Sequence, residues 1–155
     1  MPDSTFNKLS QKVWLFAGEA SGDLYGAHLC QELKRARGDL QIEGMGGEAM
    51  RAAGVDILVD STELGVVGLV EVLKHYPMFR RIFYGLVDRA AAERPDLIVL
   101  IDYPGFNLRF AEKMKKLGIP VVYYISPQVW AWGKKRIPVL GRVVDEMLVI
   151  FPFER

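Results

Sequence analysis

Short apolar runs alternate along this chain with segments whose apolar residues recur at helical spacing. The short runs predict strands at Val13–Ala17, Ile42–Met45, Val55–Val59, Leu97–Ile101, Pro120–Ile125 and Met147–Ile150. The periodic segments predict helices from Leu24 to Leu33, Glu48 to Ala53, Leu69 to Tyr76, Pro77 to Ala92, Asn107 to Leu117 and Gly133 to Leu140. This alternation predicts the α/β class: a doubly wound, mostly parallel sheet with helices on both faces, as in Rossmann-like folds.

The composition fits one globular domain and argues against several other classes of protein. The 155 residues are half hydrophobic and carry a formal charge of +1, which argues against disorder and against a nucleic-acid binder that relies on bulk charge. No apolar run reaches the length of about 20 residues that a membrane-spanning helix needs. The polar N-terminus and the single cysteine, Cys30, favour a cytoplasmic location.

Three predicted turns follow strands, and we expect them to meet at the carboxyl edge of the sheet, where open parallel sheets bind ligands. These turns are Gly18–Asp23, Asp102–Asn107 and Ser126–Trp132. The first turn lacks the glycine spacing of a phosphate-binding loop, and Glu19 and Asp23 would repel a phosphate there. It suits a site for hydroxyl groups, or else Ser21 or Asp23 simply caps the next helix.

Asp102 ends the most apolar predicted strand. A carboxylate at that place would be partly desolvated, with the raised pKa that suits a general base. Asn107 would cap the following helix or bind a ligand, while a carboxylate that only caps nearby N–H groups is the alternative for Asp102. Neither His28 nor His75 fits a catalytic triad, and the sequence contains no cluster of metal ligands, so we expect no metal and no cofactor.

The third turn contains Ser126, Gln128 and two tryptophans, and Lys134, Lys135 and Arg136 follow it. Basic side chains beside aromatic ones suit an anionic ligand such as a sugar phosphate or a lipid phosphate. The alternative is a pair of core tryptophans followed by a solvated basic helix.

A further stretch, from Leu64 to Phe83, has more apolar surface than one helix face usually buries. With Lys74, Arg80 and Arg81 interspersed, its exposed part would contact acyl chains while the cations meet anionic head groups. Contact between a helix and the sheet must bury the rest of this apolar surface. The candidate acyl-chain residues are Leu64, Val66, Val67, Leu69, Val70 and Leu73.

Four ordered motifs together resemble the lipid-A-disaccharide synthase family over nearly the whole chain. They are Ala17–Asp23, Leu64–Leu73, Ile101–Asn107 and Ser126–Trp132, and the ending Phe151–Glu154 also looks like that family. The family consists of inverting glycosyltransferases with two Rossmann-like domains, the GT-B type. The resemblance implies transfer of 2,3-diacylglucosamine from UDP to 2,3-diacylglucosamine 1-phosphate, which yields the lipid A disaccharide and UDP.

The resemblance also implies roles for particular residues. Asp102 matches the family's catalytic base, and we expect Glu19, Ser21, Asp23, Asn107, Ser126 and Gln128 to bind substrate or orient the base. The apolar stretch matches the family's membrane-facing patch, which implies peripheral contact with the cytoplasmic face of the bacterial inner membrane. A dimer is compatible with this interpretation, and a nucleic-acid partner is not expected.

The family's chain is more than twice as long, and its second half binds the UDP-sugar donor. We therefore expect residues 1–155 to be a single acceptor-side domain, inactive without a donor domain. Two alternatives remain open: a non-catalytic lipid- or sugar-binding module, and half of another nucleotide-sugar enzyme such as an epimerase. The apolar stretch argues against the epimerase, since a soluble sugar needs no entry for acyl chains.

Overall fold

The computed structural model of the protein describes residues 11–62, 76–124 and 145–148. Its elements, in chain order, are β1 (Lys12–Ala17), α1 (Ala20–Ala36), β2 (Gln41–Gly46), α2 (Glu48–Ala52), β3 (Asp56–Asp60), α5 (Tyr76–Glu93), β4 (Leu97–Ile101), α6 (Pro104–Leu117), β5 (Val121–Tyr124) and β6 (Glu146–Leu148). Each described strand and helix was predicted from the pattern of the sequence. The predicted helices at Leu69–Tyr76 and Gly133–Leu140 lie, wholly or almost wholly, outside the described residues.

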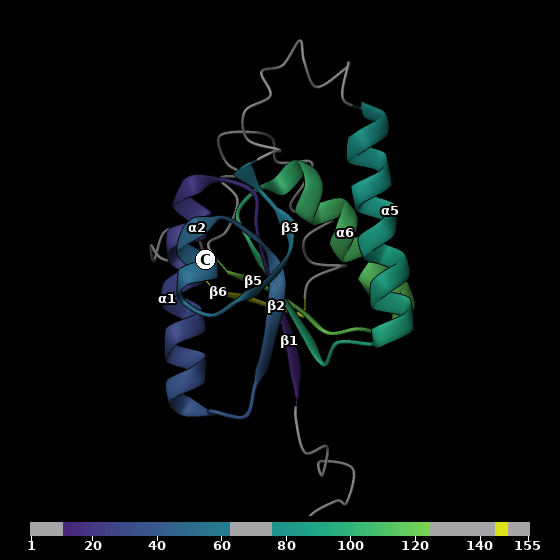
Figure 1. Ribbon diagram of the computed structural model, residues 1–155. Helices are drawn as coiled ribbons and strands as arrows, with labels where there is room; N and C mark the ends of the chain where they lie inside the picture. Colours follow the sequence, from purple (N-terminus) through teal and green to yellow (C-terminus); the bar gives the residue numbers. More distant parts are fainter. Residues whose placement is uncertain (1–10, 63–75, 125–144, 149–155) are drawn as a thin grey trace, which may run out of the picture.

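The strands form one parallel sheet with helices against both of its faces. The strand order is β3-β2-β1-β4-β5-β6, and every neighbouring pair is parallel. Helices α1 and α2 cover one face, and α5 and α6 cover the other (Figure 1). This is the doubly wound arrangement that the alternation predicted, and its order reverses between β1 and β4, where such folds bind ligands.

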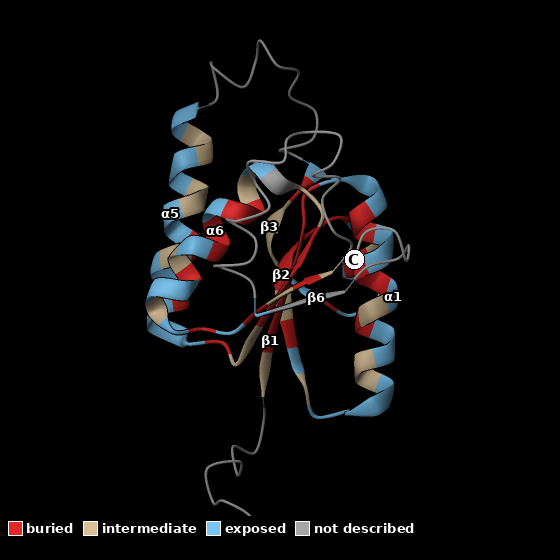
Figure 2. Cartoon of the chain, turned by 180° about the vertical axis from the view of Figure 1, so that it is seen from behind, coloured by how far each residue is buried: buried red, intermediate tan, exposed pale blue. Residues whose placement is uncertain are grey.

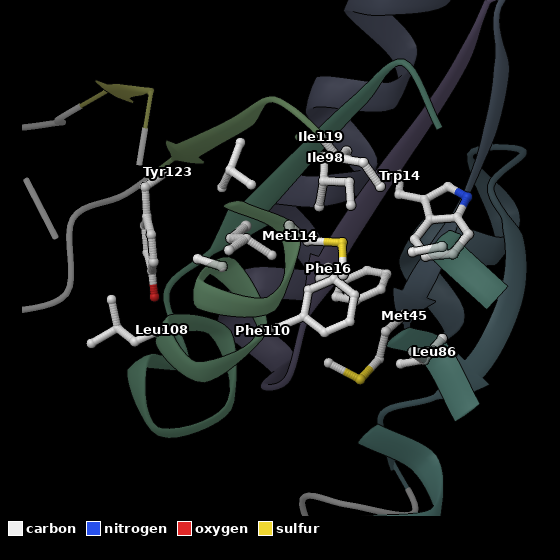
Figure 3. Packing of buried hydrophobic residues seen from close by; sticks show 14 residues of the cluster. Trp14, Phe16, Met45, Leu86, Ile98, Leu108, Phe110, Met114, Ile119 and Tyr123 are labelled. Atoms are coloured by element: carbon white, nitrogen blue, oxygen red, sulfur yellow. The ribbon is translucent and has the colours of Figure 1, made fainter. Parts of the chain in front are cut away.

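Alternate residues of β1 supply the two halves of the core. Trp14 and Phe16 point to the face that α5 and α6 cover, whereas Leu15 and Ala17 point to the face of α1 and α2. Figure 3 shows Phe16 beside Phe110 of α6, and their ring centroids lie 4.8 Å apart. Because both faces of the strand are buried, an unbroken apolar run rather than an alternating one encodes it.

Two details of the local structure differ from the predictions. The first turn is shorter than expected because α1 already begins at Ala20, so that Ser21 and Asp23 lie in its first turn. The prediction that Asn107 caps α6 is wrong, since that helix begins at Pro104, whose fixed φ suits a first helical position. Gly118 does end α6 in the left-handed conformation, as predicted.

Candidate functional site

The ends of β1 and β4 bring two of the predicted turns side by side. The two strands are neighbours, and Ala17 pairs with Ile101 in the register, so the chain leaves both strands at the same level. The ring of Tyr103 then lies directly over Gly18, where an added Cβ would be only 2.2 Å from the ring. Glycine at position 18 is therefore what allows the two turns to touch.

Asp102 occupies an unusual backbone conformation at this edge. Both Asp102 and Tyr103 have positive φ, at 47° and 50°. Such a conformation is costly for residues other than glycine, and strained residues of this kind concentrate at functional sites when the surroundings hold them in place. The turn is therefore a candidate site on geometric grounds alone.

Two side chains hold this turn by its carbonyl groups. The buried Asn107 donates from Nδ2 to the carbonyl oxygen of Asp102 at 2.8 Å and to that of Ile101 at 3.4 Å. The hydroxyl of Tyr123, on β5, also donates to the carbonyl oxygen of Asp102. Among the described residues, no group donates a hydrogen bond to the buried Oδ1 of Asn107, so the amide of Asn107 acts here as a donor to the turn.

Burial changes the acidity of two groups in the turn. Desolvation raises the pKa of the Asp102 carboxyl, although a hydrogen bond from the backbone N–H of Tyr103 opposes the shift. Desolvation also raises the pKa of the Tyr103 phenol, and the negative charge of Glu19 adds to that effect. The half-buried Asp102 thus has the stronger basicity that the sequence predicted for it.

Asp23 is tied to the backbone of another helix. Its Oδ1 accepts hydrogen bonds from the N–H groups of Gly47 at 2.7 Å and Met50 at 3.1 Å, and its Oδ2 accepts one from Ala49 at 2.9 Å. The carboxylate therefore caps α2, whereas the sequence suggested a cap on its own helix. With both oxygens engaged and the residue buried, Asp23 offers little to a ligand.

Glu19 and Ser21 are exposed at the same edge of the sheet. Glu19 is the N-cap residue of α1, but its side chain makes no capping hydrogen bond. Both side chains are therefore open to a ligand beside the turn. The predicted site residues Ser126 and Gln128 lie outside the described residues, as does the whole acyl-chain set, Leu64, Val66, Val67, Leu69, Val70 and Leu73.

A groove of about 530 Å³ opens next to the turn, between α5 and α6. Tyr103 lines it, together with aromatic side chains of both helices and the cations Arg80, Arg109 and Lys113. The sequence pattern predicts Tyr103 only as part of a turn, and Arg109 and Lys113 are not among the predicted site residues. Helical spacing from Gly105 to Arg109 to Lys113 would have put these positions on one face, but it does not reveal which helix lies opposite.

Within the described ranges, no three side chains of the His, Cys, Asp or Glu type come together as a metal site would require. No helix there is long and apolar enough to cross a membrane. At this edge of the sheet the described residues place the half-buried carboxyl group of Asp102 beside the exposed side chains of Glu19 and Ser21.

The sequence is similar to a known family over most of its length. The family model described as lipid-A-disaccharide synthetase matches residues 13–155. The lipid-A-disaccharide synthase of Geobacter sulfurreducens is 50% identical over 145 residues, and that of Coxiella burnetii is 48% identical over 145 residues. These alignments cover 94% of this chain but only 38% and 39% of the two relatives.

Solved structures with a similar fold have little sequence in common with this chain. The UDP-GlcNAc 2-epimerase from Neisseria meningitidis superimposes with a TM-score of 0.61 at 11% identity, over 90% of this chain and 40% of the epimerase. A putative UDP-N-acetylglucosamine 2-epimerase from Listeria monocytogenes has the same score and identity, over 90% of this chain and 39% of its own. At this identity the likeness establishes the fold alone.

Proposed function

Because the chain belongs to the lipid-A-disaccharide synthase family, we propose that it forms the acceptor side of a glycosyltransferase of lipid A biosynthesis. The reaction joins UDP-2,3-diacylglucosamine to 2,3-diacylglucosamine 1-phosphate and releases UDP. This chain spans about 38% of the length of the relatives it matches. In our proposal a donor domain, corresponding to their remaining length, holds the UDP-sugar, and transfer takes place between the two domains.

The observation that carries the proposal is the strained, half-buried turn at Asp102. Its carboxylate takes the proton from the acceptor 6-hydroxyl while that oxygen attacks the anomeric carbon and the bond from this carbon to UDP breaks. Desolvation raises the pKa of Asp102, which makes the carboxylate a better proton acceptor than an exposed aspartate. Asn107 and Tyr123 keep the turn in place by binding its carbonyl group.

The other predicted residues surround this base in the proposed site. Glu19 and Ser21, exposed at the end of β1, bind hydroxyl groups of the acceptor sugar, and Ser126 and Gln128 complete the site. Asn107 is a positioning residue because it acts through the backbone of Asp102. We propose that the apolar set from Leu64 to Leu73 contacts the cytoplasmic face of the inner membrane and admits the acyl chains.

The decisive experiment joins this chain to the remaining length of the Geobacter sulfurreducens relative and measures disaccharide formation. The substitution Asp102→Asn should lower the rate at least about 100-fold, since removal of a general base has effects of that size. Binding of the acylated acceptor should stay within twofold. Asp88→Asn, which removes an exposed carboxylate of α5, serves as the matched control and should leave the rate unchanged.

Unchanged turnover in the Asp102→Asn protein would remove Asp102 as the base. A joined protein that binds the acylated acceptor but transfers nothing would support the non-catalytic lipid-binding module instead. Interconversion of UDP-N-acetylglucosamine with its 2-epimer would support the epimerase alternative. The first outcome would reject the role of Asp102, and each of the other two would replace the proposed function with one specific alternative.

A further inference from the structure

The groove between α5 and α6 is built from aromatic side chains that neither helix fully buries. Tyr76 and Tyr84 are 55% and 43% exposed, and Phe79 and Phe83 are only partly buried. In Figure 2 the N-terminal half of α5 shows only exposed and intermediate residues, and the buried ones begin at Leu86. A contiguous aromatic surface of this kind on a folded domain indicates a binding site.

Three cations surround this aromatic surface. The guanidinium carbon of Arg80, on α5, lies 5.5 Å from the Tyr84 ring centroid, and Nζ of Lys113, on α6, lies 5.7 Å from the same centroid. Arg109 lies one helical turn before Lys113 on the groove side of α6. None of the three forms an ion pair within the described residues, and Glu112 is the single carboxylate in the lining. The groove therefore combines an apolar floor with an excess of positive charge.

The packing of the rings favours a flexible chain over a flat ring as the occupant. Phe83 meets Tyr84 and Phe106 edge to face, with interplanar angles of 85° and 78°. These edge-to-face rings form no parallel-sided slot in which a nucleobase would lie between two rings. A hydrocarbon chain, in contrast, adapts to such a surface. The volume of about 530 Å³ lies within the range of small-molecule sites.

We propose that this groove binds one molecule of an anionic amphiphile, with its alkyl chain on the rings of Phe79, Phe83 and Phe106 and its phosphate at Arg80, Arg109 and Lys113. Tyr103, the residue that follows Asp102, lines the groove, so the groove lies next to the turn that carries the candidate base. In assigning the groove to the acylated acceptor, the inference rests on the proposed function. Binding itself is a property of these residues and is measured without any transfer reaction.

The test uses the 155-residue protein and alkyl phosphates below their micelle-forming concentrations, measured by titration calorimetry. The dissociation constant should fall from octyl to decyl phosphate by up to about 15-fold, because each buried methylene contributes about fourfold. Inorganic phosphate alone should not bind at millimolar concentration. An affinity that does not depend on chain length would overturn the proposal.

Two glycines provide a matched pair of variants. Gly105 lines the groove and Gly85 lies on α5 outside the lining, and an added Cβ meets nothing within 4 Å at either position. Gly105→Leu should therefore fill the groove without a clash and weaken decyl phosphate binding at least tenfold, whereas Gly85→Leu should leave it unchanged. Equal weakening in both variants, or in neither, would contradict the proposal.

Further measurements separate the contribution of the cations in the groove from that of the alkyl chain of the ligand. Arg109→Gln combined with Lys113→Gln should weaken decyl phosphate binding at least tenfold while preserving the dependence on alkyl-chain length.

If uridine monophosphate displaced decyl phosphate and bound more tightly, the groove would be a nucleotide site. If the protein bound only phosphatidylglycerol vesicles and no monomeric alkyl phosphate, this face would contact membranes rather than hold a single molecule. Either result would overturn the proposal.

Failure of the groove proposal and failure of the proposed transferase function give different experimental results. Loss of the chain-length dependence together with a rate that still depends on Asp102 would reject the groove alone. Alkyl phosphate binding that follows the predicted pattern, in a joined protein without transferase activity, would reject the proposed function alone.

Discussion

At the scale of single residues, the turn at Asp102 has a backbone conformation that is unfavourable in free energy. Two consecutive residues other than glycine in the left-handed region cost about 1–3 kcal/mol each. Hydrogen bonds from Asn107 and Tyr123 to the carbonyl group of Asp102 help to offset this cost. The same contacts fix the direction in which the chain leaves β4, and therefore the position of the carboxylate.

The raised pKa of Asp102 predicts how stability changes with pH. A carboxyl group that binds its proton more tightly in the folded state stabilises the fold below its unfolded pKa of about 3.8, and this contribution is lost as the pH rises through the folded pKa. The Asp102→Asn protein has no ionisable group at this position, so it does not undergo this loss. Its free energy of unfolding, relative to that of the parent, should therefore be higher at pH 7 than at pH 3.

Urea unfolding of the two proteins at both pH values measures this difference. Any effect of asparagine on the left-handed backbone is the same at pH 3 and pH 7, so each variant serves as its own control. A difference in the free energy of unfolding that does not change with pH would show that burial does not affect the ionisation of Asp102.

At the scale of elements, the short helix α2 depends on a side chain from α1. Five residues form too short a helix to be stable alone, and its N-cap, Gly47, has no side chain to cap it. Asp23 accepts hydrogen bonds from three N–H groups at this end instead. A negative charge at a helix N-terminus also interacts favourably with the helix dipole.

Asp23→Ala should lower the free energy of unfolding by about 2–3 kcal/mol, because it leaves buried N–H groups without acceptors. Asp23→Asn retains one acceptor oxygen and should lose less. Ser21→Ala, an exposed change in the same helical turn, should stay within about 0.5 kcal/mol of the parent. Chemical denaturation tests all three, and equal losses in Asp23→Ala and Ser21→Ala would contradict the capping role.

At the scale of the whole molecule, the candidate base and the groove lie at the same edge of the sheet. Both α5 and α6 belong to the face of the sheet that carries Trp14 and Phe16, and α6 starts directly after the Asp102 turn. The N-terminal half of α5 extends past α6 at this edge (Figure 1). An acceptor held in the groove would therefore present its sugar at the edge where a donor domain is proposed to face this one.

This arrangement predicts that the 155-residue protein has no transferase activity of its own. The described residues contain no phosphate-binding loop, and the acidic Glu19 is the N-cap residue of α1, where a diphosphate would otherwise bind. Equilibrium dialysis should detect no UDP binding, and an assay with both acylated sugars should detect no disaccharide. The protein joined to the remaining length of a relative is the positive control. Measurable turnover by the 155 residues alone would overturn the division of the site between two domains.

The periodic pattern of apolar residues was enough to predict every described element, because a strand buried on both faces and a helix buried on one leave different spacings. The boundaries were less certain at helix N-termini. The first turn of α1 and the start of α6 contain glycine, serine and proline, which are as compatible with a turn as with a helix. In both places the helix begins earlier than predicted.

The sequence by itself determined the α/β class, because the spacing of apolar residues is a pattern between neighbours along the chain. It also singled out Asp102, at the end of an apolar strand and within a family motif, as the base that we propose. Only the tertiary structure decided that Asp23 caps α2, that Asn107 and Tyr123 hold the Asp102 turn, and that α5 and α6 enclose a groove. The capping contact, the Tyr123 contact and the groove join residues that are far apart in the sequence, and for Asn107 the start of α6 decides where its side chain points. The local periodicity of the sequence carries no information about contacts between distant residues or about the residue at which α6 starts.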